Sequence, residues 1–191
     1  MVQPQRILVI RRDNIGDLVC STPLIAQLHR HFAASTIRCL VNSYNAGVLS
    51  GNPDVDQVYV YQKLKHVSGG ALAKLAALWE RVSLILCLRL WNPDLVVLAK
   101  SSYDRHGLRF ARQIGAKRVI GFAGAQGDPQ PDIALPEVPD FRRVHEVICI
   151  SEISRKLGID SQPGPLKMYP QPDLIRSYRL RIVAEMRPVI A

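Results

Sequence analysis

The segment RRDNIGD, residues 11–17, brings two arginines, two aspartates and one glycine together in seven residues. It follows the apolar run RILVI, residues 6–10, which is typical of a buried strand, and it precedes an amphipathic helical pattern. Ligands of open parallel sheets bind beyond the carboxyl ends of the strands, which is where this segment would lie. It could therefore be a phosphate-binding loop, carry a catalytic carboxylate, or simply begin a helix.

The number of glycines disfavours a phosphate-binding loop. The segment holds Gly16 alone, whereas G-x-G-x-x-G and G-x-x-x-x-G-K-[ST] both require more glycines at fixed positions. The pair Gly69-Gly70 does not closely follow a predicted strand and is assigned to the start of the next helix. Neither standard nucleotide loop is therefore predicted after the first strand.

Asp17 is the candidate for catalysis in this segment. The dipole and free N–H groups of a helix start favour an ionised carboxylate, which can accept a hydroxyl proton as a general base. From the residues alone a structural role is the favoured interpretation, because aspartate is a favoured helix cap and Asp13 or Asn14 could cap the helix equally well. The helix could also begin only at Thr22, with a proline at its first position. The residues by themselves leave these alternatives open.

Basic side chains follow the first and third predicted strands. In a Rossmann-like sheet these strand ends can face one crevice, where basic groups would form a positive rim for carboxylates or phosphates. The alternative is that they are scattered, solvated surface charges. The residues concerned are Arg11, Arg12, Lys63, Lys65 and His66.

No metal site is predicted. The four cysteines lie far apart without a C-x-x-C pair, and the histidines have no ligand spacing. This use of cysteine is typical of a reduced, cytosolic setting. Cys20, near the expected helix start, could have a lowered pKa, but an inert thiol is the favoured interpretation.

Short apolar runs alternate with helical patterns along most of the chain. This alternation predicts a parallel sheet with helices on both faces, a Rossmann-like α/β domain over residues 5–159. The proline-rich stretch 123–141 is expected to be a surface loop, 142–159 a helix, 160–187 a linker with an interdomain helix, and 188–191 the start of a second domain. The expected strands are 6–10, 36–42, 57–61, 95–99 and 118–122, and the other expected helices are 23–32, 71–90, 105–115 and, within the linker, 174–186. Gly115 and Gly158 are expected to stop the helices over 105–115 and 142–159.

The formal net charge of +9 and the pI of about 9.7 favour an anionic partner. Nucleic acid, a membrane surface and a phosphorylated or acidic substrate would all fit. Nucleic-acid binding is disfavoured, because the basic residues are spread out and neither a helix-turn-helix nor an aromatic RNA-binding motif is present. The most apolar region, residues 71–99, is interrupted by charges and cannot supply about 20 uncharged residues for a membrane span.

The run RILVIRRDNIGDLVCSTPLIAQLHRHF, followed by IRCLVNSYNAGVLSGNPDVDQVYVY, resembles the amino-terminal half of glycosyltransferase family 9, the ADP-heptose:lipopolysaccharide heptosyltransferases. The marks are IGD after the first strand, Pro23 six residues later, and NPDVDQV before the third strand. RVIGF and HEVICISEISRKLGI also match the pattern. FAAST departs from it, since many members carry a proline after the phenylalanine.

The resemblance implies the acceptor-binding half of a GT-B enzyme that transfers heptose from ADP-heptose to a lipopolysaccharide core with inversion. Asp17 would be the general base, and no metal or cofactor would be needed. The acceptor, a lipid A precursor, would meet Arg11, Asn14, Gly16, Lys63, Lys65 and His66. The enzyme would be cytoplasmic and peripheral on the inner membrane, with no nucleic-acid partner.

The RPVIA run at 187–191 resembles the first strand of the family's donor-binding domain, so these 191 residues alone are expected to be inactive. The alternative interpretation is a non-catalytic, basic Rossmann-like module that binds anionic lipid, sugar phosphate or a protein partner.

Overall fold

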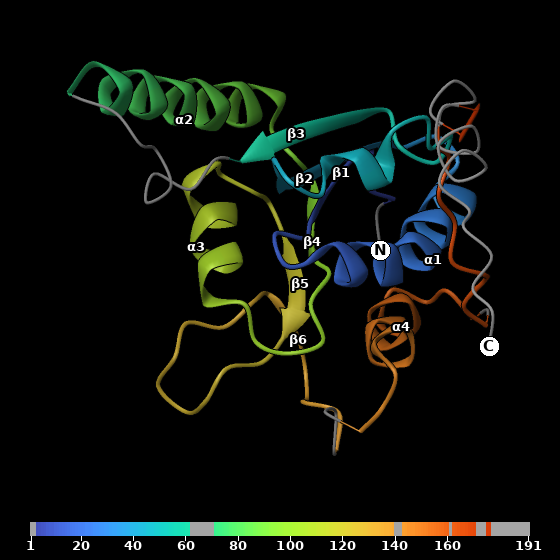
Figure 1. Cartoon of the computed structure of the whole chain (residues 1–191). Helices are drawn as coiled ribbons and strands as arrows, with labels where there is room; N and C mark the ends of the chain where they lie inside the picture. Colours follow the sequence, from blue (N-terminus) through green and yellow to red (C-terminus); the bar gives the residue numbers. More distant parts are fainter. Residues whose placement is uncertain (1–2, 62–70, 140–142, 161, 171–174, 177–191) are drawn as a thin grey trace, which may run out of the picture.

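The computed structural model describes residues 3–61, 71–139, 143–160, 162–170 and 175–176, with the backbone alone for 71–74. Six strands form one sheet in the order β3-β2-β1-β4-β5-β6, and all five neighbouring pairs are parallel (Figure 1). This is the strand order of a doubly wound Rossmann domain, so the predicted fold class is confirmed. The strands are β1 Arg6–Ile10, β2 Thr36–Asn42, β3 Gln57–Tyr61, β4 Leu95–Leu98, β5 Val119–Phe122 and β6 Ile133–Leu135.

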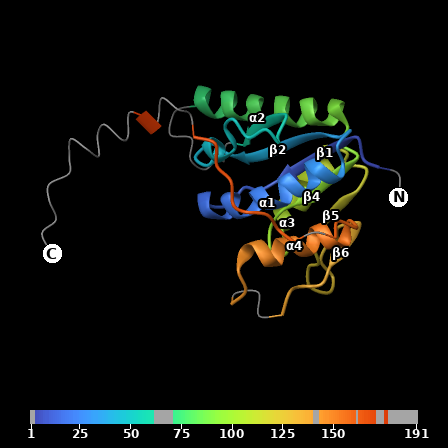
Figure 2. The ribbon, with the colours of Figure 1, turned by 90° about the vertical axis from the view of Figure 1, so that its right-hand side faces the viewer.

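Helices cover both faces of the sheet, as Figures 1 and 2 show. Alternate side chains of β1 enter opposite cores: Ile7 and Val9 pack with residues of α1 and α4, whereas Leu8 and Ile10 pack with residues of α2 and α3. Both faces of the central strands are therefore buried, which explains why β1 and β4 are nearly continuous apolar runs. The helices are α1 Ile15–His31, the short 3₁₀ helix η1 Ala46–Leu49, α2 Ala71–Trp91, α3 Arg105–Gln113 and α4 Glu146–Lys156.

Helix α1 begins at Ile15 with Asn14 as its cap, and it continues through Pro23. The alternative start at Thr22 is therefore wrong, and the helix expected over 23–32 is present but begins eight residues earlier, at Ile15. A proline inside a helix leaves the carbonyl four residues earlier without its backbone donor. Here that carbonyl belongs to Val19, and the Thr22 hydroxyl donates a hydrogen bond to it at 2.7 Å. The threonine thus satisfies the acceptor that the proline abandons.

The proline-rich stretch expected to be a loop contains strand β6, which pairs with β5. Asp132, directly before β6, accepts hydrogen bonds from the Val119 N–H at 2.7 Å and from the Arg112 guanidinium at 2.8 and 2.9 Å. Burial raises the pKa of Asp132, but the bonds from Arg112 and Val119 outweigh it, so the pKa is lowered. A strand of three residues is too short to leave a clear periodicity in the sequence.

The helix expected over 142–159 is shorter, because α4 begins at Glu146. His145 caps it by accepting the Val147 N–H on Nδ1 at 3.3 Å. Gly158 and Gly115 end α4 and α3 with φ values of +81° and +72°, in agreement with their predicted role as helix stops.

Residues 162–170 have no helix or strand and run along α1 (Figure 2). The Lys167 N–H donates to the Thr22 hydroxyl at 3.1 Å, and the Gln27 side chain donates to the Gln162 carbonyl at 3.3 Å. Apart from residues 175–176, the helix expected over 174–186 and the strand expected at 188–191 lie outside the described residues, so the predicted domain division stays a prediction. Among the described helices, none is long and apolar enough to cross a membrane.

Candidate active site at the carboxyl edge of the sheet

The site lies where the strand order reverses, between β1 and β4. Arg11 directly follows β1, and its guanidinium Nη1 donates a hydrogen bond to the carbonyl of Ala99, the first residue after β4. Ligands of doubly wound sheets bind in the crevice at this switch point. The Arg11 side chain is only 3% exposed, so it is buried beneath this switch point.

Arg11 is surrounded by three carboxylates. Its Nη2 lies 2.7 Å from Glu146 Oε1 and 3.3 Å from Asp17 Oδ1, and its Nε lies 3.6 Å from Asp13 Oδ2. A buried guanidinium stays charged and must be paired, and these acids supply that pairing. One cation among three acids leaves the cluster rich in carboxylate oxygens.

The Asp17 carboxylate is held at both oxygens. Oδ1 faces Arg11, while Oδ2 accepts the backbone N–H of Asn14 at 3.2 Å, an arrangement typical of a capping box at a helix start. The side chain is nevertheless 33% exposed. Asp17 is therefore fixed in orientation and still accessible to solvent, which a general base requires.

Gly16, next to Asp17, has no structural reason to be a glycine. It lies in the first turn of α1, and a Cβ built on it would meet nothing within 4 Å. A helix is less stable with glycine at an interior position than with alanine. The open space in front of Gly16 therefore leaves room for a ligand to approach the backbone closely.

The loop between β1 and α1 is tied down by residues that the sequence prediction did not identify. Asn42 donates to the Arg12 carbonyl, and both Tyr44 and Asn45 donate to the Asp13 carbonyl, the latter at 2.9 Å. Asn42 and Asn45 are buried. The available signal was Asn42 at the end of the predicted strand 36–42 with Asn45 three residues later, because amides that become buried need partners.

Glu146 was also missed, although it lies within the quoted HEVICISEISRKLGI. Of the three carboxylates around Arg11, that of Glu146 lies closest to the guanidinium, across 135 residues of sequence. In a sequence, an acidic residue in the first turn of a helix is ordinarily explained by its favourable interaction with the helix dipole. That explanation gives no indication that Glu146 also pairs with Arg11.

The predicted basic rim is not assembled as expected among the described residues. Arg11 points into the carboxylate cluster, whereas the Arg12 guanidinium lies over the rings of Tyr61 and Phe110, at 5.1 and 5.9 Å from their centroids. Lys63, Lys65 and His66 lie outside the described residues. The acceptor-binding roles given to these residues, to Asn14 and to Gly16 stay predictions.

Burial raises the pKa of the Cys20 thiol, and the negative charges of Glu146 and Asp17 add to this effect. The alternative of a lowered pKa is therefore wrong, and the result agrees with an inert thiol.

Within the part of the chain that the structure describes, no cluster of three or more histidine, cysteine, aspartate or glutamate residues is arranged to hold a metal ion.

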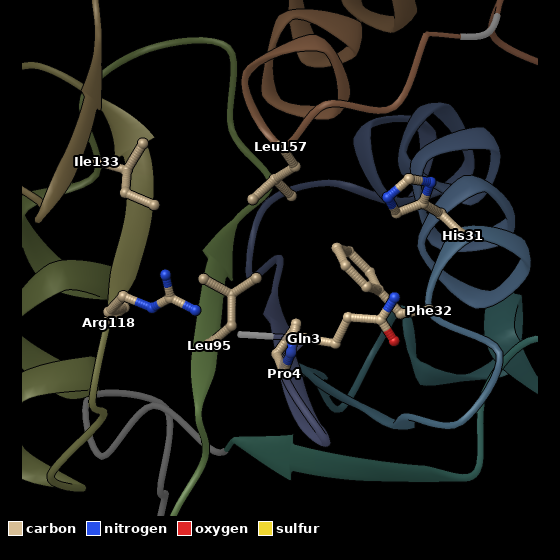
Figure 3. A pocket seen from close by; sticks show the side chains of 8 residues that line it. All are labelled: Gln3, Pro4, His31, Phe32, Leu95, Arg118, Ile133 and Leu157. Atoms are coloured by element: carbon tan, nitrogen blue, oxygen red, sulfur yellow. The ribbon is translucent and has the colours of Figure 1, made fainter. Parts of the chain in front are cut away.

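A cavity of about 240 Å³ lies at the opposite edge of the sheet (Figure 3). Leu95 and Ile133, which line it, are the first residues of β4 and β6, so the cavity is at the amino ends of the strands. It is therefore remote from the edge where doubly wound sheets bind ligands. Its lining consists of Gln3, Pro4, His31, Phe32, Leu95, Arg118, Ile133 and Leu157.

No protein-family model matches the sequence, and no curated protein matches it either. Solved structures do match the fold. A glycosyltransferase of family 9 from Veillonella parvula DSM 2008 aligns with a TM-score of 0.72 at 18% identity, over 97% of this chain and 51% of its own. This chain has the fold of glycosyltransferase structures.

Two E. coli enzymes align as well. Heptosyltransferase WaaC, solved with ADP-2-deoxy-2-fluoro heptose, gives a TM-score of 0.63 at 15% identity, over 85% of this chain and 51% of its own. ADP-heptose lps heptosyltransferase II gives 0.56 at 16% identity, over 96% and 51%. The chain thus spans about half the length of the structures it matches, and at these identities the likeness shows the fold alone.

Proposed function

We propose that this chain is the acceptor-binding part of a glycosyltransferase that moves heptose from ADP-heptose to a lipopolysaccharide core acceptor with inversion. The observation that carries the proposal is the Asp17 carboxylate at the switch point, oriented by the Asn14 N–H at 3.2 Å and Arg11 at 3.3 Å. The similarity in fold to a family 9 glycosyltransferase and to two heptosyltransferases supports it.

In the proposed reaction Asp17 accepts the proton of the acceptor hydroxyl. The oxygen then forms a bond to the anomeric carbon, on the face opposite the diphosphate, while the bond between that carbon and the diphosphate breaks and its electron pair leaves with ADP. The role of Arg11 in this step is to position Asp17. Arg11 holds Asp17 Oδ1, so that the free lone pairs of the carboxylate face the crevice.

The remaining roles follow from this assignment. Residues 5–159 would bind the acceptor, 160–187 would connect the two halves, and 188–191 would begin the donor-binding domain. Lys63, Lys65 and His66 would contact acidic groups of the acceptor, with Asn14 and Gly16 close by. The enzyme would be cytoplasmic and peripheral on the inner membrane, and no cofactor enters the chemistry.

A transfer assay with ADP-heptose and a lipid A precursor tests the assignment in a protein that contains both halves. We expect Asp17→Asn to lower turnover by orders of magnitude while donor binding is retained, and these 191 residues alone to show no transfer. Asp13→Asn is the matched control, since Asp13 contacts the same guanidinium but lies outside α1, and we expect a much smaller loss. Near-normal turnover by Asp17→Asn would contradict the role of Asp17. Absence of transfer by the unmodified protein would favour the non-catalytic module.

A further inference from the structure

Helix α2 carries a row of large apolar side chains on its outer face. Their spacings of three and four residues place them on one side of the helix. Trp79 is 72% exposed and Leu90 is 85% exposed, and the row lies opposite Leu88, which is fully buried in the core. We call this row the α2 stripe. It consists of Leu75, Leu78, Trp79, Val82, Leu86 and Leu90.

The α2 stripe is unusual for a helix on the surface of a domain. Such a helix normally places charged residues on its outer face, whereas α2 is apolar on both sides. Isolated exposed leucines are ordinary, but a contiguous apolar strip along a whole helix indicates a contact surface. Figures 1 and 2 show α2 at the top of the molecule in both views, above the sheet.

Basic side chains lie beside the α2 stripe on α2 and α3, and Glu80 is the one acidic residue in the sequence of α2. Arg89 is exposed and its Nη1 lies 3.5 Å from the carbonyl of Gln113, the last residue of α3, so the two helices approach each other there. The exposed side of α3 carries Arg105, His106 and Arg109, and α3 contains no acidic residue. The surface next to the stripe is therefore positively charged.

We propose that the α2 stripe lies in the surface of an anionic lipid bilayer, with the arginines of α2 and α3 contacting the headgroups. An interfacial helix has Trp and Leu on one face and arginine beside it, and its binding combines buried apolar area with attraction to anionic lipid. Trp79 is suited to this boundary, since its ring is apolar and its N–H can meet the headgroups. The assignment gives a surface to the membrane location in the proposed function.

The test is co-sedimentation of the 191-residue chain with phosphatidylglycerol/phosphatidylcholine vesicles and with pure phosphatidylcholine vesicles. We expect binding to the anionic vesicles to exceed binding to the neutral ones, and added salt to weaken it. The double variant Trp79→Glu, Leu86→Glu should lower the partition coefficient at least about tenfold. Arg105→Gln with Arg109→Gln should lower it less and reduce its dependence on salt.

The matched control is Ile148→Glu. Ile148 is 51% exposed on α4, which covers the opposite face of the sheet, and its replacement should leave vesicle binding unchanged. Circular dichroism establishes that each variant is folded, which is expected because the substituted side chains point into solvent. Equal loss from Ile148→Glu and from the stripe variant would overturn the assignment.

A second measurement does not depend on the glutamate variants. The chain has two tryptophans, so Trp91→Phe leaves Trp79 as the only reporter. Its emission should shift to the blue with anionic vesicles and be quenched by brominated acyl chains. Unchanged emission, or a concentration-dependent dimer that the stripe variant abolishes without any vesicle binding, would overturn the assignment. Vesicle binding is measured without transfer, so it can fail or succeed independently of the role of Asp17.

Discussion

The two edges of the sheet each hold a cluster of arginine and carboxylate, and the clusters are built in opposite ways. At the amino edge one carboxylate, Asp94, accepts hydrogen bonds from the N–H groups of Gln5 and Arg6 and from the Lys117 ammonium at 2.7 Å. At the carboxyl edge one cation, Arg11, serves three carboxylates.

The two clusters differ in how many donors serve each carboxylate, and this difference decides whether a carboxylate only stabilises the fold or can also accept a proton. Asp94 is saturated with donors: burial raises its pKa, but hydrogen bonds from Lys117 and Arg6 outweigh that and bring the pKa from 3.8 to about 2. Such a carboxylate has no capacity left to accept a proton near neutral pH. The Arg11 cluster has more acceptor oxygens than donors, so Asp17 keeps free lone pairs where a substrate would arrive.

The strongest test of the difference between the two edges is Asp17→Asn in a protein with both halves. Loss of a general base should reduce turnover about 100- to 10,000-fold, whereas Asp94→Asn in the same protein should leave turnover at its original level below the melting temperature. Rates measured for both variants at one temperature decide the matter. Similar losses from the two substitutions would show that the edges do not differ in function.

Removal of the central cation should have the largest effect on stability. Arg11→Ala leaves Glu146 and Asp17 facing each other without the buried charge between them, and we expect a loss of about 3–5 kcal/mol in the free energy of unfolding. Urea denaturation at pH 7 measures it. Adding Glu146→Gln to Arg11→Ala should recover part of the loss, since one uncompensated charge is removed. A loss below about 1 kcal/mol would mean that the cluster acts as an exposed surface pair.

At the amino edge, the contribution of Asp94 to the free energy of unfolding should depend on pH. Asp94→Asn should cost about 2 kcal/mol at pH 7, because hydrogen bonds to an ionised group are lost. The pKa of Asp94 is lower in the folded than in the unfolded protein, so its stabilisation is complete above pH about 4 and disappears as pH falls through about 2.

Unfolding of wild type and Asp94→Asn, followed from pH 5 to pH 2, tests this sign. The difference between the two proteins should shrink steadily as the pH falls. A difference that stays constant over this range would show that Asp94 contributes through packing instead of charge.

The smallest effect expected is at Gly16. Gly16→Ala should raise the free energy of unfolding by about 0.5–1 kcal/mol, since the added Cβ meets nothing and alanine favours the helix. If the acceptor passes over this position, the same methyl group should raise the KM for the acceptor. Thermal unfolding and acceptor kinetics on one variant separate the two effects, and an unchanged KM would argue against close approach at Gly16.

Much of the fold could be predicted because its signals are local. β1, β2 and β3 have the predicted bounds, and Gly115 and Gly158 end their helices with positive φ as expected. Strand and helix patterns depend on neighbours within a few residues, and the glycine stops depend on one backbone conformation. Strand β6 was missed because it has three residues and is stabilised by Asp132, whose partners lie 13 and 20 residues away.

The continuity of α1 shows where a local rule fails. Thr22 before Pro23 was a reasonable helix start, because a proline fits the first turn. The structure instead extends the helix to Ile15 and satisfies the abandoned Val19 carbonyl with the Thr22 hydroxyl. The propensity of one residue is weak compared with the burial of a whole helix face against the sheet.

The sequence by itself determined the alternating architecture, the edge at which RRDNIGD lies, and Asp17 as the carboxylate to consider there. Only the tertiary structure decided that Arg11 turns inward to Asp17 and Glu146, and that the outer face of α2 is left apolar. The reason is the range of the interactions. Periodicity places a residue on a face, but which charges meet across 135 residues, and which face stays uncovered, depends on how the elements pack.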